Sequence, residues 1–210
     1  MGLFGRVAIA ASGLLLALFS AVHLAGLAVA WWDPPGFERY AAALHHASWL
    51  PVVEVALVLP LLLHPVQALA RTLANRVARG GGGPPRSRRG EGVEPLAALA
   101  GRLMPWSGGL LLLFLLVHLA QLRLRRPANG AELAALQEVL AQPLWFALYA
   151  AAGVALALHL FHGQESAFRS LGLLHPRQSL AIRWVGRGLA VILGAGFALL
   201  LFILRGGAPA

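Results

Sequence analysis

Long apolar segments alternate with shorter polar connections along the whole chain. Five segments consist mostly of apolar residues, at approximately 7–32, 50–71, 103–124, 143–165 and 181–204. Each is long enough to cross a lipid bilayer as an α-helix, which takes about 20 apolar residues. The first is also much longer than the apolar core of a secretory signal peptide, which spans about 7–15 residues. The pattern therefore predicts an all-α integral membrane protein with five transmembrane helices in a single membrane domain, 1–210.

The polar connections predict how these helices are oriented. The basic residues are all Arg, and most of them lie before the first segment and in the connections after the second and fourth. In a five-helix chain, those three regions fall on the same side of the membrane. Because cytoplasmic connections are enriched in basic residues, we expect a multi-pass protein whose N-terminus is cytoplasmic. The Gly- and Pro-rich stretch 80–94 is expected to be a flexible cytoplasmic linker, and 132–140 a short amphipathic helix at the outer surface.

Composition narrows the classes of function. Hydrophobic residues make up 59% of the chain and charged residues 12%, so the lipid bilayer has to act as solvent for much of the surface. The net charge is +9, but the Arg residues are separated by apolar runs, and we expect no nucleic-acid partner. There is no Cys, which excludes a thiolate-bound iron–sulfur cluster within this chain. No glycine-rich nucleotide motif is present either, so a flavin would have to be bound by a partner.

The first and third apolar segments share a pattern that repeats at an offset of 95 residues. Ser12-Gly13 precedes His23 at the same distance at which Ser107-Gly108 precedes His118, and each histidine begins the sequence His-Leu-Ala. The two segments therefore look like copies of each other. Serine and glycine at these positions are expected to help helices pack closely.

The same offset relates a second pair of histidines, His64 in the second segment and His159 in the fourth. An internal two-helix repeat follows, in which the first four helices form a bundle. His23 and His118 lie past the middle of helices that run outward, whereas His64 and His159 lie past the middle of helices that run inward. Each pair is therefore expected at one depth, the first in the outer half of the membrane and the second in the inner half.

Two histidines at one depth on facing helices can bind a haem iron from both sides. The two layers therefore predict two b haems. A single histidine inside a membrane can instead form a hydrogen bond with a neighbouring helix. Zinc and copper also accept imidazole, but two ligands in each layer are too few for either metal.

Three further points concern titratable side chains. His162 lies one turn beyond His159 on nearly the same face and is an alternative inner ligand, although His159 keeps the 95-residue offset. Apart from Glu165 at the very end of the fourth segment, Glu54 is the only carboxylate within an apolar segment. It is expected either to reach water at the helix end or to transfer protons at a quinone site beside the outer pair.

The other histidines lie in the connections, where solvated or interfacial side chains are expected: His45, His46 and His175.

At these residues the chain resembles the dihaem, five-helix cytochrome b subunit of succinate dehydrogenase and fumarate reductase. The resemblance spans nearly the whole chain, through an ordered set of motifs that are individually of low specificity. The motifs are Ser107-Gly108 before His118, Glu54 with Pro60-Leu61-Leu62-Leu63-His64, Pro143-Leu144-Trp145-Phe146, and His159 to Gly163 leading into Ser166-Ala167-Phe168. The resemblance implies His23 and His118 as outer-haem ligands, His64 and His159 as inner-haem ligands, and a role for Glu54 at the quinone site.

The resemblance also implies a function and partners. Such a subunit lies in the bacterial inner membrane and carries electrons between an iron–sulfur subunit and menaquinone through its two b haems. The dehydrogenase active site, the FAD and the iron–sulfur clusters would belong to a flavoprotein and an iron–sulfur partner. Two alternatives stay open, namely a b-type cytochrome subunit of a formate dehydrogenase or hydrogenase, and a haem-free membrane transporter or assembly protein.

Overall fold

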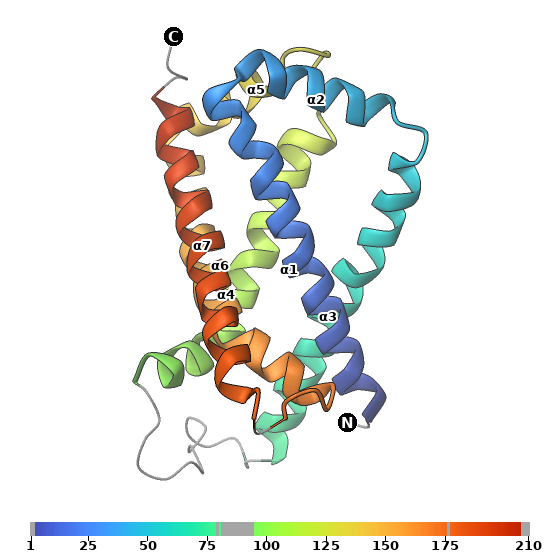
Figure 1. Cartoon of the computed structure of the whole chain (residues 1–210), viewed down its shortest axis with the longest axis vertical. Coiled ribbons are helices and arrows are strands. Elements are labelled where there is room, and N and C mark those ends of the chain that lie inside the picture. The colour runs from blue at the N-terminus through green and yellow to red at the C-terminus, as the bar shows by residue number, and fades with distance from the viewer. Residues whose placement is uncertain (1–2, 79, 81–94, 176, 207–210) are drawn as a thin grey trace.

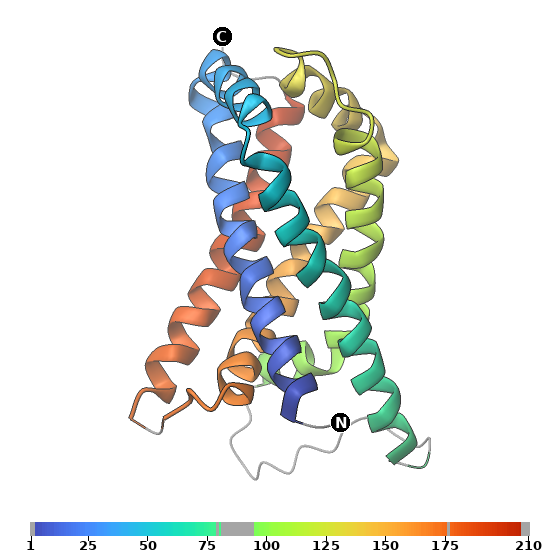
Figure 2. The same ribbon diagram turned by 90° about the vertical axis from the view of Figure 1, so that its right-hand side faces the viewer.

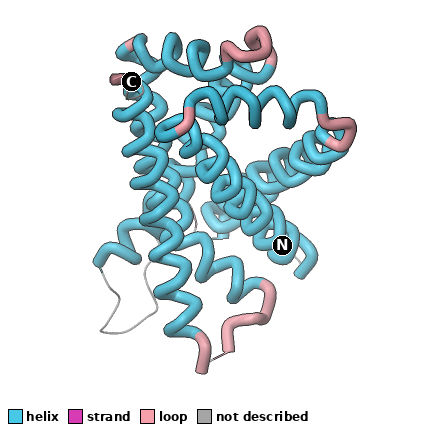
Figure 3. Tube along the Cα trace, turned by 45° about the horizontal axis from the view of Figure 1, so that its top comes forward, coloured by secondary structure: helices cyan, strands magenta, loops and turns pink. Residues whose placement is uncertain are grey.

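The computed structural model describes residues 3–78, 80, 95–175 and 177–206, which form seven α-helices and one short π-helix. No strand occurs within these ranges, as the tube in Figure 3 shows. Five of the helices are long and apolar enough to cross a membrane, which confirms the predicted fold class. These five are α1 (Leu3–Trp32), α3 (Leu50–Ala78), α4 (Pro95–His118), α6 (Pro143–Ser170) and α7 (Ser179–Arg205). The predicted linker lies outside the described residues, except for Gly80.

Several of the long helices extend past the limits that hydropathy predicts. Helix α3 continues to Ala78 instead of ending near 71, α4 begins at Pro95 instead of 103, and α6 ends at Ser170 instead of 165. Hydropathy marks where a helix leaves the lipid. The backbone hydrogen bonds of the helix continue through polar residues, so the helix itself ends farther out.

The five long helices run side by side, and α1 begins at the opposite end of this assembly from the end of α7 (Figure 1, Figure 2). Helix α1 packs on α3, and α4 packs on α6, so the two helices of each repeat are neighbours. Helix α7 packs on α6 and α1, outside these four helices. At the α6–α7 contact, a Cβ added to Gly194 would lie 2.5 Å from the Cβ of Ala157. Small residues let helix backbones approach closely in lipid.

Large apolar side chains cover the outside of the helices. Leu18, Val58 and Ile192 are each about half exposed or more, whereas small residues such as Ala17 and Ala190 lie buried between helices. In water this distribution would be unfavourable. In a bilayer the exposed side chains meet lipid tails, so the distribution agrees with the predicted membrane location.

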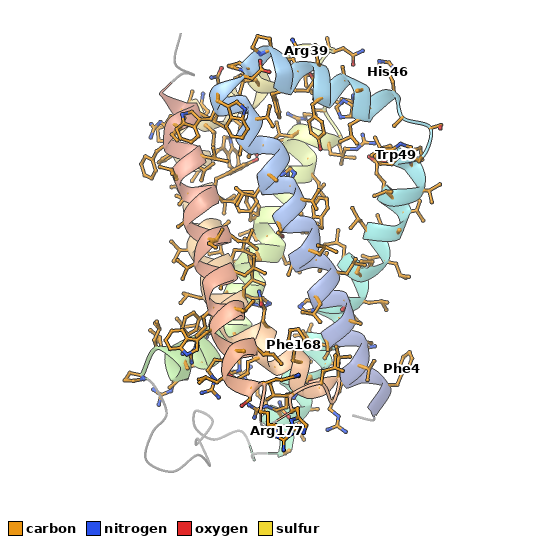
Figure 4. All side chains as sticks on the ribbon, in the orientation of Figure 1. Phe4, Arg39, His46, Trp49, Phe168 and Arg177 are labelled. Carbon is orange, nitrogen blue, oxygen red and sulfur yellow. The ribbon has the colours of Figure 1, made fainter. Side chains whose placement is uncertain are left out.

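Two short helices lie across one end of the bundle. They are α2 (Pro34–His46) and α5 (Glu132–Ala141), and side chains of α2 such as Arg39 and His46 mark this end in Figure 4. The predicted amphipathic helix at 132–140 corresponds to α5, which buries Leu133, Leu136 and Leu140 against α6 and α7. Helix α2 was not predicted. We refer to α2 and α5 together as the cap.

Candidate functional site

The four predicted histidines form two pairs inside the bundle. The ring centroids of His23 on α1 and His118 on α4 are 6.0 Å apart, and the ring planes make an angle of 77°. The ring centroids of His64 on α3 and His159 on α6 are also 6.0 Å apart, with 71° between the planes. Each pair joins one helix from each half of the repeat. The structure thus brings together the pairs that the 95-residue offset predicts.

The separation within each pair suits a metal ion between the rings. An imidazole nitrogen binds a transition metal at about 2 Å, so two rings on opposite sides of one ion have centroids about 6 Å apart. Among the described residues, no group of three or more His, Asp or Glu side chains could hold a metal. Each layer therefore offers two imidazoles only, which suits haem, because the porphyrin supplies the remaining iron ligands.

Hydrogen bonds hold the inner ring of His64 in one tautomer. Its Nδ1 lies 3.1 Å from the carbonyl oxygen of Ile9 and 3.3 Å from the hydroxyl oxygen of Ser12. The Ser12 hydroxyl donates its own proton to the Ala8 carbonyl at 2.6 Å. Because a carbonyl can only accept, the Nδ1 of His64 has to carry the proton. Its Nε2 then keeps a lone pair, as a metal ligand requires.

The second half of the repeat reproduces this arrangement around His159. Its Nδ1 lies 3.2 Å from the hydroxyl oxygen of Ser107, and that hydroxyl donates to the Met104 carbonyl at 3.2 Å. The hydroxyl oxygen therefore accepts from Nδ1, and Nε2 of His159 is again left with a lone pair. Among the described residues, neither inner ring uses Nε2 in a hydrogen bond.

The glycine after each serine makes room for the inner ring. A Cβ added to Gly13 would lie 2.9 Å from Cε1 of His64, and one added to Gly108 would lie 3.2 Å from Cε1 of His159. The sequence predicts only a packing role for the Ser-Gly pairs. In the structure they also position the inner histidines. The sequence signal for this role is the internal repeat. Ser12-Gly13 and Ser107-Gly108 are separated by 95 residues, as are His64 and His159, the rings that they contact.

The outer ring of His118 takes part in a different hydrogen-bond chain. Its Nδ1 lies 3.1 Å from the hydroxyl oxygen of Tyr149, and the Tyr149 hydroxyl donates to Oε1 of Gln121 at 3.1 Å. The tyrosine oxygen therefore accepts from Nδ1, which again leaves Nε2 with a lone pair. Gln121 lies in the π-helix Leu119–Arg123, which continues α4 directly after His118. A π-helix is a rare element that often marks a functional site.

Aromatic rings support both outer histidines. Phe19 stacks on His23 with centroids 5.6 Å apart, and its copy Phe114 stacks on His118 at 5.4 Å. Phe197 of α7 lies 6.1 Å from His23. His23 forms no hydrogen bond within the described part of the chain, so the outer layer departs from the symmetry of the repeat.

Glu54 forms an ion pair that the sequence does not predict. Its carboxylate accepts from Nε of Arg123 at 2.8 Å and from Nη2 at 2.9 Å, and the two side chains are 35% and 46% exposed. The structure does not place Glu54 in contact with a ring of the outer pair. The role of Glu54 in proton transfer stays a prediction. Any such role has to involve Arg123 as well, because the two side chains form an ion pair.

His162 lies against α4 beside Gly101, one helical turn from His159. A Cβ added to Gly101 would lie 3.2 Å from Cε1 of His162, whereas the ring that faces His64 belongs to His159. The geometry therefore favours His159 as the inner ligand.

The cap contains a cluster of titratable side chains. Glu38 of α2 accepts from the backbone N–H groups of Glu132, at 3.3 Å, and Leu133, at 2.9 Å, at the start of α5. Burial and a hydrogen bond with the Glu132 side chain raise the pKa of Glu38. At Glu132, burial acts to raise the pKa, but hydrogen bonds with Glu38 and with the backbone outweigh burial and lower the pKa. The Nδ1 of His45 lies 3.4 Å from Oε1 of Glu132, and the His45 side chain is only 19% exposed.

The chain matches no protein-family model, no curated protein and no solved structure. A function therefore has to be inferred from the geometry of the two histidine pairs.

Proposed function

We propose that the chain is a dihaem cytochrome b, the membrane anchor of a succinate dehydrogenase or fumarate reductase in the bacterial inner membrane. The observation that supports this most strongly is the pair of matched histidine layers, each with 6.0 Å between ring centroids. Ionisable groups inside a membrane are costly and usually mark a functional site. Helix packing alone gives no reason for four histidines to meet in two pairs at the offset of an internal repeat.

The protein would supply ligation and orientation. The Nδ1 hydrogen bonds of His64, His118 and His159 hold three of the four rings in the tautomer whose Nε2 can bind a metal. Phe19 and Phe114 hold the outer rings by stacking. When bound, the two b haems supply the one-electron carriers between the iron–sulfur clusters of a partner and menaquinone.

The proposed partners follow from what the chain lacks. Without Cys, it cannot hold iron–sulfur clusters, so these and the FAD belong to an iron–sulfur subunit and a flavoprotein. The end of the bundle at which α1 begins also carries most of the Arg residues that the structure describes, which favours a cytoplasmic position for that end. The iron–sulfur subunit would dock there, below the inner pair of histidines.

Glu54 and Arg123 are the proposed proton-transfer residues at the quinone site. Arg123 follows the outer ligand His118 in the same continuous helical segment. It binds Glu54 through both carboxylate oxygens, so proton uptake by Glu54 requires this ion pair to open. We therefore propose that the quinone binds beside the outer histidine layer.

Purification of the tagged chain from its native membrane tests the functional assignment. A flavoprotein and an iron–sulfur protein should copurify, and the complex should transfer electrons between succinate or fumarate and a menaquinone analogue. A molybdenum or nickel protein in their place would assign the chain to a formate dehydrogenase or hydrogenase. A preparation without haem and without redox partners would favour a transporter or assembly protein.

A further inference from the structure

A basic pocket lies between the first turns of α1 and the last turns of α3. It has a volume of about 300 Å³ and is lined by Arg6, Arg71, Ala74, Asn75 and Ala78. This volume is at the lower end of the range for small-molecule sites, which is about 300–1,000 Å³. The two guanidinium groups come from different helices and meet at the end of the bundle where Figure 4 labels Phe4.

The positive charge of the pocket is not balanced within the part of the chain that the structure describes. Among the described residues, neither Arg6 nor Arg71 has an acidic partner. By contrast, Arg169 and Arg183 at the same end of the bundle both pair with Glu165, at 2.7 and 3.2 Å. Helix α1 begins at Leu3, so the positive end of its helix dipole adds to the field at the pocket. An anion would be stabilised there.

The surroundings of the pocket are those of a membrane surface. Arg71 is the first charged residue after the apolar part of α3. Leu73 and Val77 on the same helix are 50% and 81% exposed, and Phe4 on α1 is 83% exposed. Exposed apolar side chains beside guanidinium groups suit a ligand with both an acyl chain and an anionic headgroup. Basic pockets between transmembrane helices are known to bind anionic lipid headgroups.

We propose that this pocket binds the phosphate headgroup of an anionic phospholipid, with Arg6 and Arg71 as phosphate ligands and the Asn75 amide as a further donor. The bound lipid would connect the ends of α1 and α3. The same two helices meet where Ser12 contacts His64, so the lipid would stabilise the helix pair that supports the inner histidine. The site requires no haem, and it goes beyond the proposed function.

Native mass spectrometry of the full-length chain, delipidated in detergent and titrated with phosphatidylglycerol, tests this proposal. An Arg near the membrane surface strengthens anionic lipid binding by about fivefold. The Arg6→Gln and Arg71→Gln variants should each bind about fivefold more weakly, and the double variant roughly 25-fold more weakly. Arg76→Gln is the matched control, because Arg76 is an exposed residue of α3 that does not line the pocket. It should bind like the wild type.

Four results would overturn the proposal. Equal weakening in Arg76→Gln would mean that the lipid responds only to overall charge. Equal binding of phosphatidylcholine would mean that the pocket does not select an anionic headgroup. Displacement of phosphatidylglycerol by inorganic phosphate at equal concentration would assign the pocket to a soluble anion. Loss of haem with unchanged lipid binding in the double Arg variant would assign the two Arg residues to the carboxylates of the haem.

A haem-free variant separates this proposal from the proposed function. His64→Ala/His159→Ala should retain phosphatidylglycerol with the affinity of the wild type, because the pocket contains neither histidine. Loss of lipid binding in that variant would contradict an independent lipid site. If the wild-type chain proves to bind no haem, the lipid experiment still gives its own answer.

Discussion

Ser107 and Gly108 act on the same ring in different ways. The serine oxygen accepts a hydrogen bond from Nδ1 of His159 at 3.2 Å, which sets the tautomer. The glycine leaves space in which the ring lies against the backbone of α4, because any Cβ there would lie 3.2 Å from Cε1. A side chain at this position would move the imidazole relative to its partner His64. Groups that orient a ligand in this way typically change metal affinity by about 10–100-fold when they are mutated.

Under the proposed function, Gly108→Ala should therefore weaken haem binding at the inner histidine pair by about 10-fold or more and leave the outer pair unchanged. Gly109→Ala is the matched control, because a Cβ added at the next residue meets nothing within 4 Å. Haem content and the visible spectra of the two purified variants provide the measurement. Equal haem loss in both variants would show that this stretch of α4 is simply intolerant of alanine.

Tyr149 is expected to tune the outer site through His118. Its hydroxyl accepts from the Nδ1 of His118, and such hydrogen bonds make the imidazole a stronger electron donor to the metal. Tyr149→Phe removes the hydroxyl but retains the ring that packs edge-on against Phe114 at 4.8 Å. The midpoint potential of the outer haem should become more positive, because the oxidised iron loses stabilisation, while that of the inner haem stays unchanged. A redox titration of the variant checks this, and an unchanged outer potential would contradict the role of Tyr149.

At the scale of elements, the sequence predicts the helices that long apolar runs mark. It misses the elements that depend on local backbone geometry. The five apolar segments correspond to α1, α3, α4, α6 and α7. Helix α2 was missed because it carries no long apolar run, although Asp33 followed by Pro34-Pro35 is a typical helix start. In the structure, the Asp33 carboxylate accepts from the N–H of Gly36 at 2.8 Å. The π-helix Leu119–Arg123 adds one residue to a turn, and no pattern in the sequence indicates it.

The contact between α2 and α5 should depend on pH through Glu38 and Glu132. The pKa of Glu38 is raised above its ordinary value of 4.5, so its contribution to stability is full below that value and is lost as the pH rises through the raised pKa. The pKa of Glu132 is lowered, so its contribution is present above 4.5 and is lost as the pH falls through the lowered pKa. The contact should be most stable near pH 4.5, where the two carboxyl groups share a proton.

Glu38→Gln should remove the loss of stability on raising the pH from about 4.5 to about 8. The amide oxygen still accepts from the start of α5, and the amide group stays neutral and can donate to Glu132. Glu138→Gln is the control. Glu138 is an exposed carboxylate of α5, the helix that contains Glu132, and its removal should leave the wild-type pH dependence. Thermal unfolding in detergent at several pH values provides the measurement. The interpretation fails if the wild type shows no decline or if both variants abolish it.

For the whole molecule, the internal repeat predicts which histidines meet. The two histidines of each pair are 95 residues apart and therefore lie at the same position of corresponding helices. It does not predict the departures from symmetry. Glu54 and Tyr149 occupy corresponding positions at the 95-residue offset, yet Tyr149 binds the outer ring of His118 whereas Glu54 binds Arg123. The Glu54–Arg123 pair lies between residues far apart in the sequence and depends on the π-helix that positions Arg123. Contacts of this kind follow from tertiary packing, which hydropathy and spacing do not encode.

The haem content of the purified chain tests the central claim most directly. If the two matched histidine layers are the axial ligands that we propose, the chain binds two b haems, measured as pyridine haemochrome together with a reduced-minus-oxidised spectrum. His23→Ala or His118→Ala should remove one haem, and His64→Ala or His159→Ala should remove the other, while His162→Ala should retain both. A chain without haem would contradict the cytochrome assignment. A single haem, or the loss of the same haem from both sets of variants, would contradict the two-layer site.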